Sequence, residues 1–336
     1  MDKKFRVVLV GCGSMAHTWV EYAKTRDDTS LVAVVDIQLA AATALLERHV
    51  LTCQAFTSLT EALNATNANL VFDVTIPEAH EEVVLTALKA GCDVFGEKPL
   101  AASLAAAQGM VKTALETGRT FAIMQNRRFN NQIRAYQDLI KVIGDVGFLS
   151  ANFFIAPHFG GFREAMQSPL LLDMAIHTFD AARFLSGADA VSVYCHEFNP
   201  KGSWYAGHAN AICIFEMSDG SVFSYNGSWA AEGASTAWEA EWRVVGSRGT
   251  AIWDGTNPPF AEIVQNPEQE SFIKDYTRVT AIVPTLPEGH HACLEDMFTA
   301  LLENLAPQTI CTDNIKSLAM VFAALESSRL GQKVML

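Results

Sequence analysis

The sequence predicts an α/β domain with a doubly wound parallel sheet over residues 1–124, followed by an α+β domain with an open, mostly antiparallel sheet over residues 125–336. Up to residue 124, short apolar runs alternate with segments of helical periodicity, as a parallel sheet requires. From Phe148 onward, apolar and polar residues alternate within runs separated by turns, which is typical of antiparallel strands. A chain of 336 residues also exceeds what one core usually supports.

Local signals mark the elements of the first domain. Ser58 and Glu61 have the spacing of a capping box, Pro77 suits the first position of a helix, and Gly91 suits a helix end. Strands are expected over residues 5–10, 31–35, 53–56, 70–75, 93–96 and 120–124, and helices over residues 17–26, 38–49, 58–63, 77–91 and 103–116.

The second domain is expected to be one open sheet whose helices cover a single face. The apolar side chains of runs such as Ser221–Trp229 are expected on the other face, where an exposed apolar surface usually marks an interface. Residues 257–287 are expected to be an irregular excursion. Strands are expected within 148–156, 190–198, 209–217, 221–229 and 239–246, and helices over 130–143, 169–185, 290–304 and 313–330.

Composition excludes several classes of protein. The net charge of −13, from 24 Lys and Arg against 37 Asp and Glu, argues against nucleic-acid binding, which needs a basic face. The seven cysteines are scattered and form no CxxC pair, so we expect reduced thiols rather than disulfides or structural zinc. The N-terminal apolar stretch is too short for a secretion signal, and no uncharged run reaches the ~18–20 residues of a membrane span. A cytoplasmic protein is therefore expected.

The first forty residues carry the strongest motif. Gly11, Gly13 and Ala16 form a G-x-G-x-x-A turn between an apolar run and a helix, and Asp36 ends the second apolar run. Glycine permits the tight turn and lets the backbone approach a pyrophosphate, the small third residue lets helix and strand pack closely, and the helix N-terminus attracts phosphate. This pattern predicts a dinucleotide-binding βαβ unit rather than an ordinary glycine turn.

Asp36 also predicts which dinucleotide binds. Its carboxylate suits the two hydroxyls of the adenosine ribose and would repel a 2′-phosphate. Ile37, Gln38 and Leu39 follow it, and the next basic residue is Arg48. We therefore expect NAD as cofactor and NADP less readily.

Two further segments are expected at the same edge of the parallel sheet, because ligands of such sheets bind outside the carboxyl ends of the strands. One is Thr75-Ile76-Pro77 with His80, and the other is Glu97-Lys98-Pro99. Lys98 at this rim is suited to hold a substrate hydroxyl. The expected cofactor-binding residues are Gly11, Gly13, Ser14, Met15, Asp36, Ile37, Thr75, Ile76, Pro77, His80, Glu97 and Lys98.

A second group of polar residues lies on a leucine-rich helix. Asp173, His177 and Asp180 are spaced by four and three, so they are expected on one helix face. His177 suits acid–base chemistry because the unperturbed pKa of histidine lies near neutrality. The alternative is a carboxylate favouring the helix dipole beside a core histidine. Arg163, in a nearby glycine-containing loop, suits either a polar substrate or solvent.

These motifs together resemble the Gfo/Idh/MocA oxidoreductases over essentially the whole chain. The resemblance rests on the G-x-G-x-x-A turn, the EKP at residues 97–99, the D-x-x-x-H from Asp173 to His177, and the segments 290–296 and 313–331. It implies a Rossmann domain, a catalytic set of Lys98, Asp173 and His177, a substrate contact at Arg128, and a homodimer or homotetramer. Ala175 departs from the family, which commonly has glycine there. Arg128, Arg163 and Asp180 are the expected substrate-binding residues, and no metal is expected.

Three functions are compatible with these residues. The first is an NAD-dependent dehydrogenase of a sugar, sugar derivative or cyclitol. The second is an NAD-dependent glycosidase that oxidises the sugar transiently, eliminates the substituent and re-reduces the product. The third is a non-catalytic regulator that senses a sugar and a dinucleotide. Retention of Lys98, Asp173 and His177 favours an enzyme over a regulator.

Overall fold

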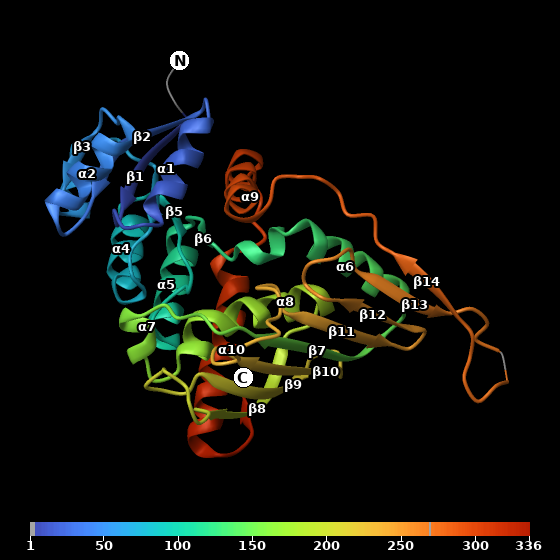
Figure 1. Cartoon of the computed structure of the whole chain (residues 1–336). Coiled ribbons are helices and arrows are strands. Elements are labelled where there is room, and N and C mark those ends of the chain that lie inside the picture. Colours follow the sequence, from blue (N-terminus) through green and yellow to red (C-terminus); the bar gives the residue numbers. More distant parts are fainter. Residues whose placement is uncertain (1–3, 269) are drawn as a thin grey trace. The chain divides into compact units, whose positions relative to one another are not determined.

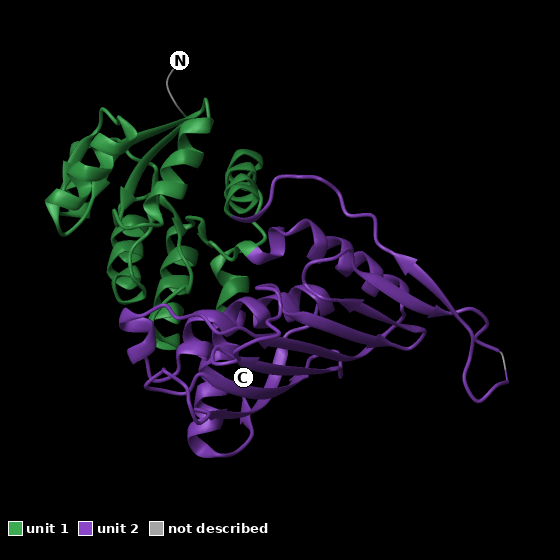
Figure 2. Ribbon diagram, viewed as in Figure 1, with its two compact units in different colours: residues 1–126, 290–315 green, residues 127–289, 316–336 purple. Residues whose placement is uncertain are grey.

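The structure, a computed structural model, describes residues 4–268 and 270–336 and forms two compact units (Figure 2). Unit 1 holds the residues up to 126 together with residues 290–315, and unit 2 holds residues 127–289 and 316–336. The boundary expected after residue 124 lies close to the first crossing. The second domain is not the continuous stretch 125–336 that the sequence suggested, because residues 290–315 belong to unit 1.

Unit 1 contains a six-stranded parallel sheet with the order β3-β2-β1-β4-β5-β6, which is the doubly wound arrangement predicted from the sequence (Figure 1). The central strands are fully buried because they are covered on both faces, and Val7, Val8 and Leu9 have no exposed surface. The strands are β1 (Phe5–Val10), β2 (Thr29–Val35), β3 (Gln54–Phe56), β4 (Leu70–Asp73), β5 (Asp93–Gly96) and β6 (Phe121–Ile123).

The helices of unit 1 begin where the sequence carries start signals. Ser58 accepts a hydrogen bond from the Glu61 N–H at 3.4 Å, Ser103 accepts one from the Ala106 N–H at 3.1 Å, and Pro77 is the first residue of its helix. The helices are α1 (Ala16–Thr25), α2 (Leu39–His49), α3 (Leu59–Ala65), α4 (Pro77–Lys89), α5 (Leu104–Thr117) and α9 (Gly289–Glu303).

The returning segment completes the core of unit 1. The ring of Phe298, on α9, packs edge-on against Phe5, Phe72 and Phe95 with centroid distances of 4.9, 6.0 and 5.3 Å. Further along, the Ile123 N–H of the edge strand β6 donates to the Thr309 carbonyl at 3.0 Å. A segment that lies far along the chain thus fills the interior of the first domain and pairs with its edge strand.

Unit 2 is built on a nine-stranded sheet with the order β14-β13-β12-β11-β7-β10-β9-β8-β15. The pair β7–β10 is parallel and its other pairs are antiparallel, so the expectation of a mostly antiparallel sheet is confirmed. The strands are β7 (Val146–Phe154), β8 (Ala190–Phe198), β9 (Asn210–Met217), β10 (Val222–Ser228), β11 (Glu241–Gly246), β12 (Gly249–Trp253), β13 (Phe260–Val264), β14 (Tyr276–Thr280) and β15 (Val334–Met335).

Two of these strands correct the expectation for residues 257–287, which was an irregular excursion. β13 and β14 lie inside this range and pair as an antiparallel hairpin that extends the sheet. All five residues of β14 are exposed, so this edge strand lacks the buried, alternating face by which strands are found in a sequence.

Helices cover one face of this sheet. Phe179, on α8, packs against Phe215, Phe223 and Tyr225 at centroid distances of 4.9, 6.3 and 5.2 Å. The helix expected over 169–185 begins as a π-helical segment, Leu170–Ala175, before it continues as α8. The helices of unit 2 are α6 (Asn131–Val142), α7 (Gly161–Ala165), α8 (Ile176–Ser186) and the part of α10 (Cys311–Leu330) from residue 316 onward, and a 3₁₀ turn, Asn126–Phe129, begins at the last residue of the first stretch of unit 1.

Three of the apolar residues in the run 221–229 do not lie on the face expected for them, whereas Val222 is half-buried on the opposite face of β10. Phe223, Tyr225 and Trp229 were expected on the open face, but their side chains are at most 1% exposed and lie in the core. The open face instead carries neighbouring apolar residues, which are exposed by 37% to 48%: Phe148, Tyr194, Ile212, Ile214 and Val245. Strict alternation identifies two faces of a strand but does not say which of them is buried.

The seven cysteines are all free thiols. Within the described residues, no helix combines the length and the apolar character of a membrane-spanning helix.

Two glycines of α5 predict opposite effects on stability. Gly109 lies inside the helix with no atom within 4 Å of an added Cβ, so Gly109→Ala is expected to raise the free energy of unfolding by about 0.5–1 kcal/mol. Gly118 ends the helix at φ +64°, so Gly118→Ala is expected to lower it by about 1–2 kcal/mol. Urea unfolding of both variants checks this pair. Equal effects would contradict the assigned helix end.

Candidate functional site

The glycine turn follows β1 in unit 1, and its two glycines have different surroundings. Gly11 has φ +90°, and a Cβ there would lie 2.5 Å from the Val74 carbonyl oxygen, so only glycine fits. Gly13 is different, because an added Cβ would meet no atom within 4 Å. Its bare backbone therefore faces open space, as a backbone that receives a pyrophosphate must. Ala16, fully buried, begins α1, and no side chain caps this helix start.

Asp36 is tied to the glycine turn. One carboxylate oxygen accepts a hydrogen bond from the Cys12 N–H at 2.9 Å, and the other accepts one from the Gln38 N–H at 2.8 Å. These bonds hold the carboxylate at the end of β2, and each oxygen keeps a lone pair for a ribose hydroxyl. The next side chain, Ile37, is 89% exposed and apolar.

Cys12, inside the glycine turn, is not an activated nucleophile. Burial, Asp36 and Cys53 raise the pKa of its thiol to about 12. Ser14 and Met15 are exposed in the same turn, as is Ile76 beyond β4, which agrees with positions open to a ligand.

The end of β4 contains a buried carboxylate, Asp73. One of its oxygens accepts hydrogen bonds from the N–H and the hydroxyl of Thr75, at 3.2 and 2.6 Å. The other oxygen is buried without a hydrogen-bond partner among the described residues. Burial raises the pKa of Asp73, and the charge of His80 opposes this shift. His80 itself is 1% exposed on α4, so the structure places it beneath this edge rather than on its surface.

Glu97 of the EKP segment is also largely enclosed. Its carboxylate accepts a hydrogen bond from the Trp19 indole N–H at 2.7 Å and one from the Lys98 N–H at 3.3 Å. His290 lies 3.8 Å from the same carboxylate, and burial lowers the pKa of this histidine. Trp19 and His290 were not predicted here from the sequence, and Lys98 is half-buried beside them. Glu97 thus anchors the chain next to Lys98.

In unit 2, two residues of the predicted polar triplet, Asp173 and Asp180, each bind a different arginine. Asp173 lies in the π-helical segment and accepts a hydrogen bond from Arg163 at 2.7 Å. Arg163 was equally compatible with substrate and with solvent, and its guanidinium also lies over the rings of Phe159 and Phe162 at 5.0 and 4.8 Å. Asp180 lies further along, in α8, and has other partners. The spacing argument assumed one regular α-helix, which the π-helical turn interrupts.

Asp180 forms a buried ion pair with Arg128. Both contacts of this bidentate pair measure 2.6 Å, and the Ser317 hydroxyl donates to the same carboxylate at 2.7 Å. Asp180 has no exposed surface. Both residues were expected to bind substrate, whereas the structure binds them to each other.

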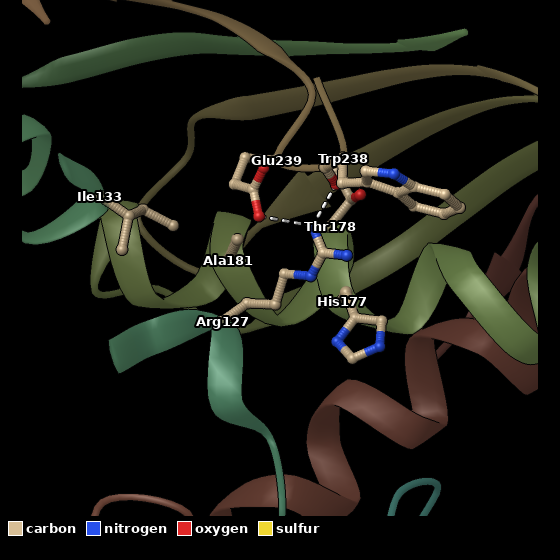
Figure 3. Close-up of a pocket in the computed structure, with 7 residues that line it drawn as sticks. All are labelled: Arg127, Ile133, His177, Thr178, Ala181, Trp238 and Glu239. Atoms are coloured by element: carbon tan, nitrogen blue, oxygen red, sulfur yellow. Dashed lines mark hydrogen bonds and ion pairs between the residues drawn. The ribbon is translucent and has the colours of Figure 1, made fainter. Parts of the chain in front are cut away.

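His177 lines a pocket of unit 2 (Figure 3). Arg127 lies in the same pocket, donates hydrogen bonds to the Trp238 carbonyl and to Glu239, and has its pKa lowered by burial. Arg128 was expected at this site from the sequence, whereas its neighbour Arg127 was not. The available signal was the pair of adjacent arginines after the last parallel strand. The pocket is lined by Arg127, Ile133, His177, Thr178, Ala181, Trp238 and Glu239.

Comparisons with known proteins agree with both units. A family model described as "Oxidoreductase family, NAD-binding Rossmann fold" matches residues 5–125, and one described as "Oxidoreductase family, C-terminal alpha/beta domain" matches residues 142–336. The chain is 31% identical to a D-glucoside 3-dehydrogenase of Escherichia coli, over 59% of each chain. It is 30% identical to an inositol 2-dehydrogenase of Paenarthrobacter aurescens, over 66% of each.

Among solved structures, an oxidoreductase from Agrobacterium radiobacter in complex with NAD+, L-tartaric acid and magnesium has the same fold. The TM-score is 0.87 at 20% sequence identity, and the match covers 99% of this chain and 98% of that one.

The Arg128–Asp180 pair predicts a large loss of stability when one partner is neutralised. Asp180→Asn leaves a buried guanidinium without its counter-charge and is expected to lower the free energy of unfolding by about 3–5 kcal/mol. Glu262→Gln, which breaks an exposed pair with Arg278, is the control and is expected to cost less than about 1 kcal/mol. The free energy of unfolding of both variants is measured by urea unfolding. Similar losses would contradict the larger contribution to stability expected from the buried pair.

Proposed function

Because the chain belongs to the Gfo/Idh/MocA oxidoreductase family, we propose that it is an NAD-dependent dehydrogenase of a sugar, sugar derivative or cyclitol. In this reaction a hydride would pass between a hydroxyl-bearing carbon of the substrate and the nicotinamide. The observation that carries the proposal is the joint retention of a dinucleotide-binding turn, the EKP lysine and the D-x-x-x-H pair in one member of this family. The two relatives named above, a glucoside and an inositol dehydrogenase, support this class of substrate.

The residues of unit 1 fit NAD. Gly13 leaves open space for a pyrophosphate, the start of α1 has no side-chain cap, and Asp36 holds its carboxylate ready for the ribose. The apolar, exposed Ile37 and Ile76 flank this edge and suit the faces of flat rings. NAD, when bound, supplies the hydride acceptor.

Each catalytic role is assigned to a side chain of the chain itself. His177 takes the proton from the reacting hydroxyl, because an imidazole is the side chain best matched to that transfer near neutral pH. Lys98 holds the hydroxyl oxygen and favours its ionised form. Asp173 supports the imidazole, and the ion pair with Arg163 fixes this carboxylate.

His177→Ala is the direct test of the mechanism. It is expected to lower kcat by about 10²- to 10⁴-fold with little change in NADH affinity, because it removes an acid–base group and no predicted cofactor contact. His196→Ala is the control, since His196 is exposed on β8. Turnover is measured as NADH absorbance with a panel that includes myo-inositol and methyl β-D-glucoside.

Near wild-type turnover of His177→Ala would remove His177 from the mechanism. Release of an aglycone by the unmodified protein without net NADH would instead support the redox-assisted glycosidase.

Cofactor preference gives a second test. A 2′-phosphate beside Asp36 brings like charges within ~4 Å, which costs about 1 kcal/mol in water and ~4 kcal/mol at an effective dielectric of 20. NAD is therefore expected to be favoured about ten- to a thousandfold in kcat/KM. The double variant Asp36→Ser, Ile37→Arg is expected to narrow or invert this preference. A higher kcat/KM with NADP in the unmodified protein would refute the role of Asp36.

We also propose that the open face of the unit 2 sheet joins copies of the chain into a homodimer or homotetramer. The exposed apolar residues of this face lie on adjacent strands, and the register places Tyr194 opposite Ile214, and Phe148 opposite Val245. Single apolar residues are normal on a protein surface, whereas a contiguous exposed apolar patch such as this one usually marks an interface.

Ile214→Glu tests this interface, because a buried charge at its centre is expected to dissociate the oligomer. Leu115→Glu is the control, since Leu115 is a 68% exposed residue of α5. Sedimentation velocity at micromolar concentration reads the mass. A monomeric unmodified protein would contradict the proposal.

A further inference from the structure

The side chain of His80 joins two loops at the cofactor edge of unit 1. One ring nitrogen, Nδ1, lies 3.0 Å from the carbonyl oxygen of Pro99, and the other, Nε2, lies 3.2 Å from the carbonyl oxygen of Thr75. Thr75 follows β4, and Pro99 is the residue after Lys98. The histidine is 1% exposed, so water does not compete for either nitrogen.

Both partners of His80 are hydrogen-bond acceptors. A neutral imidazole has one N–H, so one of its nitrogens would present a lone pair to a carbonyl oxygen at hydrogen-bond distance. An imidazolium donates to both carbonyls. These two contacts therefore select the doubly protonated ring.

The surroundings of His80 act in opposite directions on a positive charge at its ring. Burial and the nearby N-terminus of α4 disfavour a cation. Asp73, fully buried with one oxygen lacking a hydrogen-bond partner among the described residues, favours it when ionised; burial raises the pKa of Asp73, and the charge of His80 opposes that rise. Glu97 adds a second carboxylate near Asp73. A cationic His80 balances a buried carboxylate that otherwise has the Thr75 N–H and hydroxyl as its partners.

The backbone on either side of Lys98 is held by side chains. On one side, the Lys98 N–H donates to Glu97, whose carboxylate is fixed by Trp19. On the other side, the Pro99 carbonyl accepts from His80. Such anchoring is what a pre-organised catalytic group needs.

We propose that His80 is a positioning residue, held as an imidazolium, that fixes the loop bearing Lys98. It acts through Lys98 and does not touch the reacting atoms. The catalytic half of this inference rests on the proposed function, whereas the protonation state of His80 does not.

Ring ¹⁵N NMR of histidine-labelled full-length protein tests the protonation state directly. The His80 signals, assigned by their absence in His80→Phe, are expected to show two protonated nitrogens at a pH of about 7.5, where a solvated histidine is mostly neutral. A single lone-pair nitrogen would overturn the imidazolium.

A double-mutant cycle tests the positioning role. His80→Phe is expected to lower kcat by about 10²-fold, measured with the panel member of highest turnover, while NADH affinity by fluorescence changes little. In the Lys98→Ala background the same substitution is expected to have almost no further effect, because its target is already absent. An equal loss in both backgrounds would overturn the positioning role and leave His80 a structural residue.

His49→Phe is the matched control. His49 is 7% exposed in the same unit and also uses both ring nitrogens, at 2.7 Å from His17 and 2.7 Å from Glu21. The His49→Phe variant is expected to lose as much stability as His80→Phe, measured by thermal unfolding, but to keep the kcat of the unmodified protein. If Lys98→Ala alone retained full turnover, Lys98 would have no role in the proposed mechanism, and the positioning role of His80 would be refuted as well. The NMR result still decides the charge of His80.

Discussion

The parallel pairing of β1 with its two neighbours, which is level at the carboxyl ends of the strands, is the constraint on which the cofactor edge depends. The last residue of β1 lies opposite the last residues of β2 and β4, and β4 ends level with β5. The residues that follow these strands, Gly11, Asp36, Val74 and Glu97, therefore come to one level. A shift of one strand by one residue would separate the glycine turn from the carboxylate that it binds. The same shift would turn each side chain of that strand to the opposite face of the sheet.

The elements of unit 1 were predictable because their signals are local. A glycine turn, a capping serine and a proline at a helix start each act within a few residues, so the observed boundaries lie close to the expected ones. The errors in unit 2 concern information that is not local. β14 is an exposed edge strand defined by its partner, and the buried face of β10 is chosen by Phe179 of a helix that precedes it by about forty residues. Neither the composition of a strand nor its alternation reveals the pairing partner of β14 or the buried face of β10.

The sequence indicates candidate residue types for the site but does not indicate their partners. The motifs identified Asp36, Lys98 and His177 as candidates, and the structure places Asp36 at the glycine turn and His177 in a pocket. It also shows that Arg128 and Asp180 bind each other. Spacing along a helix indicates which side chains share a face, but a partner from a distant part of the chain decides whether a charge is available to a ligand. The π-helical turn before His177 further changed the spacing that the prediction had used.

The packing of Phe298 against the rings of the first sheet has a consequence for how this architecture is inherited and dissected. The nucleotide-binding half is encoded in two separated stretches of the gene, and a fragment that stops near residue 126 lacks the aromatic ring that fills its own interior. During translation, this half therefore waits for almost the entire chain before its core is complete. It also follows that transfer of this half to another protein would require residues 290–315 as well as the N-terminal stretch.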